Sequence, residues 1–204
     1  MIAHCLQASD LCCIRDDRVL FDGLNFTLSA GQVLLLEGKN GSGKTSLLRI
    51  LCGFRNPDAG EVRWDGEPIS TAHYRGDMAY IGHLDGLKKE LTVLENLKFA
   101  LALANASTTG LQTALATVQL SGYDDVLAQA LSAGQKRRVL LAKLLTVRHT
   151  LWILDEPFTA LDKQGVALVQ NVMAAHCQNG GLVVLTSHHE VHLPTIDLQR
   201  IRLA

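Results

Sequence analysis

The feature that most constrains this chain is a glycine-rich segment, residues 38–45, which reads GKNGSGKT. An uninterrupted apolar run precedes it at 33–36, and a segment with helical periodicity follows it at 44–51. This order predicts a buried strand, a turn and a helix. Glycines let successive backbone N–H groups wrap an anion, and the helix N-terminus adds partial positive charge. The sequence therefore predicts a phosphate-binding turn, called here the phosphate loop.

Each position of the phosphate loop has an expected part in holding a nucleotide. The spacing G-x-x-x-x-G-K-[S/T] is typical of nucleotide-binding proteins, with the lysine on the β- and γ-phosphates and the hydroxyl on Mg²⁺. Here Lys44 and Thr45 occupy those two positions. The loop alone leaves a small-molecule kinase as an alternative. The predicted cofactors are ATP and Mg²⁺, and the predicted nucleotide-binding residues are Gly38, Lys39, Asn40, Gly41, Ser42, Gly43, Lys44, Thr45 and Ser46.

Composition limits the size and the partners of the protein. With 204 residues, 48% hydrophobic and 19% charged, the chain is expected to fold as one globular domain. Its formal charge of −1 offers no basic surplus, so we expect no nucleic-acid partner, and we interpret the basic run 136–138 as a solvated helix face. No export signal and no C-x-x-C motif is visible, which predicts a cytoplasmic chain whose five cysteines are reduced and packed as small hydrophobes.

The apolar runs predict an α/β fold with two kinds of sheet. Residues 2–36 are expected to form antiparallel strands that end in the run 33–36, and Asp65-Gly66 indicates a hairpin. Wholly apolar strands at 151–154 and 182–185, alternating with helices, imply a parallel sheet covered on both faces.

The middle of the chain predicts a set of helices. The longest uncharged stretch, 99–123, is broken by polar residues, so we expect a helix, a turn and a helix rather than a membrane span. We predict a single domain over residues 1–204. Its core is formed by residues 1–84 and 131–204, and an inserted helical subdomain covers about 85–130.

The apolar run 151–154 ends in two carboxylates. Asp155, at the end of the predicted strand, is expected to hold Mg²⁺ through water. Glu156 is expected to polarise a water for attack on the terminal phosphate. Such a pair can also simply end a strand, but the phosphate loop favours the catalytic interpretation.

The segment LSAGQ, residues 131–135, identifies a family. Together with the phosphate loop and the strand ending in Asp155, it resembles the LSGGQ signature of ABC ATPases. The resemblance covers the whole chain and implies a P-loop NTPase of the ABC ATPase fold, with a mixed sheet core, an antiparallel β subdomain and a small inserted helical subdomain. It also implies ATP hydrolysis in a head-to-tail dimer. Ser132, Ala133, Gly134 and Gln135 would then contact the nucleotide of the second copy; an ordinary helix cap is the alternative. Ala133 stands where the family has glycine, and we expect activity to survive the extra methyl.

Two further segments resemble family motifs. Residues 158–162 look like the D-loop, which implies that Asp162 lies at the subunit boundary. His188, after the strand 182–185, looks like the switch histidine, and a neutral imidazole there can donate a hydrogen bond to the γ-phosphate. Lys44, Glu156 and His188 are the predicted catalytic residues, with His189 as the alternative histidine.

At two other positions the chain departs from the family. The segment TVLEN, 92–96, resembles the one that follows the Q-loop, which puts His83 where most members carry glutamine. The resemblance gives that position a link between Mg²⁺ or the attacking water and the membrane-contacting region, and a solvated histidine is the alternative. The family stacks an aromatic ring on adenine, where this chain has Ile14 or Arg15. Arg15 can stack as a flat cation or stay solvated, so nucleotide selectivity is expected to be loose.

Within the family, the chain most resembles the ATP-binding subunit of the cytochrome c maturation system, the haem exporter. The resemblance rests on YIGH at 80–83, LWILDEPFTA at 151–160 and PDAGEV at 57–62. It implies a peripheral ATPase on the cytoplasmic face of the inner membrane, with membrane-spanning subunits on separate chains and haem-handling membrane proteins as partners. ATP hydrolysis would drive release of a haem-loaded chaperone. The alternatives are a subunit of another ABC transporter, a soluble ABC switch, or an ATP-regulated haem or metal chaperone that uses the histidines at 188, 189 and 192.

Overall fold

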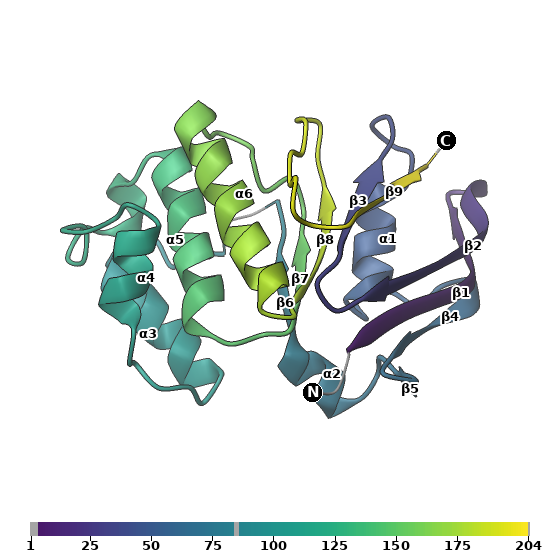
Figure 1. Ribbon diagram of the computed structural model, residues 1–204, viewed down its shortest axis with the longest axis horizontal. Helices are drawn as coiled ribbons and strands as arrows, with labels where there is room; N and C mark the ends of the chain where they lie inside the picture. The colour runs from purple at the N-terminus through teal and green to yellow at the C-terminus, as the bar shows by residue number, and fades with distance from the viewer. Residues whose placement is uncertain (1–3, 84–85, 204) are drawn as a thin grey trace.

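The strands of this chain form two separate sheets, one antiparallel and one parallel (Figure 1). The computed structural model describes residues 4–83 and 86–203. In chain order the elements are β1 (Cys5–Arg15), β2 (Arg18–Ser29), β3 (Val33–Glu37), α1 (Lys44–Leu51), β4 (Ala59–Trp64), β5 (Glu67–Pro68), α2 (Ala72–Asp77), β6 (Met78–Ile81), α3 (Val93–Leu103), α4 (Leu111–Thr117), the 3₁₀ turn η1 (Ala128–Ala130), α5 (Ala133–Thr146), β7 (Leu151–Leu154), α6 (Lys163–Gln178), β8 (Leu182–Thr186) and β9 (Leu198–Arg202).

The parallel sheet has the strand order β6-β7-β8-β3-β9 and is buried on both faces. In β3, Val33 and Leu35 pack in the cluster formed with α3–α6, while Leu34 and Leu36 pack with α1 and the antiparallel sheet. This alternation follows from the two-residue period of a strand, and burial of both faces explains why these runs are wholly apolar. The predicted parallel sheet is confirmed. The assignment of 33–36 to the antiparallel strands is wrong, because β3 pairs in parallel with β8 and β9.

The antiparallel sheet has the order β2-β1-β4-β5 and lies at the opposite end of the molecule from α3–α5 (Figure 1). Long β1 and β2 pair along their length and join through a tight turn at Asp16 and Asp17, both with positive φ. The predicted hairpin at Asp65-Gly66 is confirmed by the pairing of Trp64 with Glu67. Residues at the turn between β1 and β2 and residues at the start of α1 line the same cavity.

The helices α3 and α4 pack against α5. Helix α3 begins with a capping box, in which Thr92 and Glu95 satisfy each other's backbone N–H groups. The stretch 99–123 contains the end of α3, a turn and α4, as predicted. In the two described ranges, no helix has both the length and the apolar character that a membrane crossing requires. The subdomain boundaries near 85 and 130 stay a prediction.

Candidate functional site

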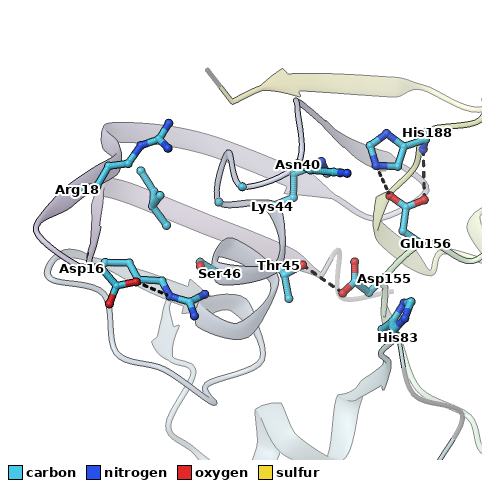
Figure 2. Close-up of a pocket in the computed structure, with 14 residues that line it drawn as sticks. Asp16, Arg18, Asn40, Lys44, Thr45, Ser46, His83, Asp155, Glu156 and His188 are labelled. Carbon is cyan, nitrogen blue, oxygen red and sulfur yellow. Dashed lines mark hydrogen bonds and ion pairs between the residues drawn. The ribbon is translucent and has the colours of Figure 1, made fainter.

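A cavity of about 610 Å³ lies beside the phosphate loop (Figure 2). Its walls come from the turn between β1 and β2, the start of α1, the segment after β6, and the ends of β7 and β8. The ends of parallel strands meet at one edge of a sheet, so residues distant in the sequence gather here. Lys44, Thr45, Asp155, Glu156 and His188 all line this cavity.

The phosphate loop curls around the side chain of Lys44. The ammonium donates hydrogen bonds to the carbonyl oxygens of Gly38, at 2.6 Å, and Lys39, at 3.1 Å. The Lys39 carbonyl also accepts from the backbone N–H of Ser42, at 3.1 Å, which closes the turn. Lys44 is thereby held at the mouth of the loop and at the first turn of α1, where an anion is stabilised by the helix dipole.

Gly38 makes this curl possible. Its φ is 150°, and a Cβ atom there would lie 2.6 Å from the carbonyl oxygen of Leu203 and overlap the hydroxyl of Ser42. Only glycine fits a backbone approach this close. Of the other predicted nucleotide-binding residues, Asn40, Gly41, Gly43, Thr45 and Ser46 line the cavity, and Ser42 is buried.

Asp155 is held with one oxygen toward Thr45. Thr186 donates to Oδ1 of Asp155 at 2.7 Å, and Thr45 donates to Oδ2 at 3.4 Å. The carboxyl is nearly buried, with Asp155 6% exposed. Two hard oxygens of this kind, a hydroxyl and a carboxylate, are the donors that Mg²⁺ prefers. The site therefore fits the predicted metal, and the roles of Thr45 and Asp155 as its ligands stay predictions.

Glu156 lies directly beside His188 (Figure 2). Its Oε2 accepts from the backbone N–H of His188 at 3.3 Å, and its Oε1 lies 3.4 Å from His188 Nε2. Within the described part of the chain, the buried Oε1 accepts no hydrogen bond. The Glu156 carboxylate lines the cavity, and a carboxylate that turns from His188 toward a water there can accept its proton as a general base. Glu156 also has a φ of 50°, a left-handed conformation that is strained for a non-glycine residue.

The structure separates the alternatives that the sequence left open. His188 and His83 line the cavity, whereas His189 packs edge-on against Phe158. Arg15 also lines it and lies 3.5 Å from Asp16, whereas Ile14 is 41% exposed and is not among the lining residues. The catalytic and adenine-binding roles themselves stay predictions.

The signature residues surround a second cavity of about 550 Å³ that shares no described residue with the first. Ser132 caps α5 and forms a capping box with Gln135. A Cβ on Gly134 would lie 3.0 Å from the carbonyl oxygen of Ala160, so this position must be small, whereas Ala133 is exposed. Asp162 lines the same cavity and caps α6 by accepting from a backbone N–H. The predicted signature and D-loop residues are thus neighbours, and they lie away from Lys44 of their own chain.

Several described residues of the site were not predicted from the sequence, namely Asp16, Arg18, Leu20, Arg137 and Thr186. Thr186 accepts from the backbone N–H of Glu156 at 2.9 Å, besides its bond to Asp155, and only its place after an apolar strand could have suggested this. Arg18 and Leu20 line the cavity beside Arg15. The interpretation of 136–138 as a solvated face is wrong for Arg137, which is 9% exposed and donates to backbone carbonyls at the site.

The histidine cluster at 188, 189 and 192 was weighed as a metal or haem site. Among the residues that the structure describes, no three His, Cys, Asp or Glu side chains are grouped in a way that could hold a metal ion. The five cysteines are unpaired and four of them are buried, of which Cys13, Cys52 and Cys177 pack in the apolar clusters.

Comparison with known proteins agrees with this geometry. The family model for ABC transporters matches residues 21–159. The chain is 54% identical over 188 residues to the "Cytochrome c biogenesis ATP-binding export protein CcmA" of Methylococcus capsulatus, covering 90% of this chain and 91% of that protein. Its identity to the protein of the same name from Escherichia coli K12 is 47% over 200 residues, covering 97% and 96%. A solved structure, a putative ABC transporter ATP-binding protein from Pyrococcus furiosus, superimposes with a TM-score of 0.85 at 26% identity, covering 98% and 97%.

The superposition on the Pyrococcus furiosus protein shows that the two chains share one fold. The chain therefore belongs to the ABC transporter family, among its cytochrome c biogenesis ATP-binding proteins.

Proposed function

We propose that this ABC-type ATPase, the ATP-hydrolysing subunit of a cytochrome c biogenesis exporter, binds MgATP in the cavity beside its phosphate loop. The observation that carries the proposal is the meeting of Lys44, Thr45, Asp155, Glu156 and His188 around one cavity. The loop N–H groups and Lys44 bind the phosphates, and the start of α1 stabilises their charge. Thr45 and Asp155 would hold Mg²⁺, which neutralises charge on the phosphate oxygens.

Glu156 and His188 are proposed to act on the reacting groups. The carboxylate of Glu156, which lines the cavity, accepts a proton from the water that attacks the γ-phosphate. His188, 55% exposed at its side chain, can turn from Glu156 to donate a hydrogen bond to a phosphate oxygen. Both side chains follow strands of the same sheet, so their separation is set by the β7–β8 pairing.

The separate signature cavity supports a dimer in which two copies face head to tail. Each nucleotide would lie between the phosphate loop of one copy and Ser132 of the other. A serine hydroxyl and backbone N–H groups at the start of α5 form a second anion site. ATP binding would close the pair, and hydrolysis would open it.

The remaining part of the proposal concerns partners. The chain is proposed to work peripherally at the cytoplasmic face of the inner membrane, beside membrane-spanning subunits and haem-handling proteins. The names of its relatives, which describe export in cytochrome c biogenesis, support this. His83, which is exposed and lines the cavity close after β6, is suited to link the nucleotide to a membrane partner.

The experiment that tests the proposal traps the ATP-bound state with Glu156→Gln. Membranes that contain this variant are extracted in mild detergent with ATP, and the co-purifying proteins are identified while the Soret region is recorded. Multispanning subunits together with haem-handling proteins are the expected result. Lys44→Ala with ATP, and Glu156→Gln without ATP, are the matched controls and should recover fewer partners.

Other outcomes overturn defined parts of the proposal. Membrane subunits of another transport system would remove the cytochrome c assignment and leave the ATPase mechanism. A Soret band on the chain alone, with no membrane partner, would favour the haem-binding chaperone instead.

A further inference from the structure

Arg137 is a buried cation whose partners are backbone carbonyls. It lies in the second turn of α5, the helix that begins at the signature residue Ser132. Its Nη2 donates to the carbonyl oxygens of Asp155, at 2.8 Å, and Glu156, at 2.6 Å. Its Nε donates to the carbonyl of Pro157 at 3.1 Å. Three successive carbonyls after β7 are therefore gathered on one guanidinium.

The fourth contact of Arg137 reaches a different segment. Its Nη1 donates to the carbonyl oxygen of Gly82 at 3.2 Å, directly before His83. One side chain thus joins α5, the carboxylates after β7 and the segment after β6. A planar fork of fixed donors can hold several acceptors at once, whereas the ammonium of a lysine cannot reproduce that geometry.

Burying the Arg137 guanidinium costs free energy of desolvation, which argues that the side chain does more than fill space in the core. Desolvation lowers the pKa of Arg137, and the nearby charges of Asp155 and Glu156 oppose that shift. A buried charge is tolerated only when it is well hydrogen-bonded. An apolar residue would fill the same space without desolvating a charge, but it would leave four carbonyl contacts unmade.

The backbone at Glu156 needs the support that Arg137 gives. With a φ of 50°, Glu156 is in a left-handed conformation that costs a non-glycine residue of order 1–3 kcal/mol. Its N–H is fixed by Thr186 and its carbonyl by Arg137, so both peptide groups of the residue are held. The direction of the carboxylate into the cavity depends on this backbone conformation.

We propose that Arg137 is a positioning residue that holds Glu156 in its left-handed conformation and ties it to the Gly82–His83 segment. The inference rests on the proposed role of Glu156 as the general base. Arg137 touches no nucleotide atom in this scheme, so its removal should affect turnover and spare nucleotide binding.

The test uses the full chain with Arg137→Lys and Arg137→Gln. Arg137→Lys keeps the positive charge but loses the planar fork of donors. Arg137→Gln removes the buried charge, so it provides a folded variant if the lysine variant does not fold. Lys143→Gln, an exposed position on the same helix, is the matched control. We expect kcat to fall at least about tenfold in both Arg137 variants, with KM for ATP within about threefold of the wild type.

A double variant separates positioning from a general structural effect. If Arg137 acts through Glu156, then Arg137→Gln added to Glu156→Gln should lower kcat no further than Glu156→Gln alone. Additive losses, a rise in KM that matches the fall in kcat, or wild-type turnover in Arg137→Lys would each overturn the proposal. Full activity of Glu156→Gln would overturn the proposed function as well, whereas the other results leave that function standing.

Discussion

At the residue scale, the cavity beside the phosphate loop has no Phe, Tyr or Trp side chain among its described lining residues. Its lining instead includes Leu20 together with Arg15, the last residue of β1, and Arg18, the first residue of β2. A guanidinium stacks on either purine, and it also pairs well with the acceptor atoms of guanine. From this set of side chains we expect binding of a purine with little preference between adenine and guanine.

The first residue-scale prediction concerns Arg15. Removing the guanidinium in Arg15→Ala should raise KM for both ATP and GTP by about two- to fivefold, the value of an exposed cation–π contact, with kcat unchanged. Steady-state kinetics with both nucleotides measure this, and Arg63→Ala on β4, outside the cavity, is the control. Unchanged KM values would mean that Arg15 is only solvated.

A second prediction compares neighbouring positions of the signature. Gly134→Ala places a methyl 3.0 Å from the Ala160 carbonyl and should lower turnover severalfold by displacing that backbone. Ala133→Gly removes a methyl from an exposed site and should leave turnover close to the wild type. ATPase assays on both variants decide the matter, and an equal loss in both would contradict the close approach at Gly134.

Residues whose roles depend on local pattern were predictable, and those that depend on packing were not. Lys44 and Thr45 follow from the spacing of the phosphate loop, and the pair after β7 follows from its apolar strand. Arg137 could not be assigned in this way, because it stands in a run of three cations and only the fold brings its guanidinium to the carbonyls after β7. Thr186 is likewise defined by the β7–β8 pairing rather than by its own segment.

At the scale of helices and strands, the elements with a strong local sequence pattern were again the ones that could be predicted. The helix expected at 44–51 coincides with α1, and β7 matches its predicted range. The predicted antiparallel pairing of β3 was wrong, because the direction in which a strand pairs depends on partners far away in the sequence. Helices α2 and α6 and the edge strand β9 were not predicted. Strand β9 alternates only weakly between buried and exposed residues, and α2 spans just six residues.

One prediction belongs to the packing of α6 on β7. His176 stacks on Trp152 with ring centroids 3.7 Å apart, and burial lowers its pKa to about 4 despite a hydrogen bond with the Thr150 carbonyl. The fold therefore favours neutral His176. Its contribution to stability is complete above the unfolded pKa of about 6.5 and is lost as the pH falls toward 4.

Denaturant unfolding at several pH values measures this effect. Between pH 6.5 and 4, the free energy of unfolding should fall by an amount of order 2–3 kcal/mol that is attributable to His176. His176→Phe keeps a ring to stack on Trp152 and should flatten that part of the profile, whereas His73→Phe, on exposed α2, should not. An unchanged profile in His176→Phe would contradict the assignment.

At the scale of the whole molecule, the phosphate loop and the signature residues lie in separate cavities of one chain. A head-to-tail pair makes each site from two copies, so damage on different surfaces should complement. Lys44→Ala and Ser132→Asp should each be inactive alone. When the two variants are mixed in equal amounts, half of the randomly formed dimers contain one copy of each, and each such dimer has one intact site out of two. The mixture should therefore recover up to about a quarter of wild-type turnover.

The control for this mixing experiment is Lys44→Ala combined with Lys44→Gln, which damages the same surface twice and should recover nothing. Dimer formation with ATP is followed in parallel by size-exclusion chromatography. Mixed dimers without any recovered turnover would contradict a shared site.

The left-handed backbone of Glu156 has a consequence for directed evolution of this protein. Glycine adopts that conformation without strain, so Glu156→Gly should raise thermal stability while it removes the proposed base. A library sorted for heat resistance alone would enrich such changes and yield robust but inactive proteins. Selection for a more heat-stable exporter subunit must therefore measure turnover in every round. At position 156, thermal stability favours glycine, whereas catalysis favours glutamate.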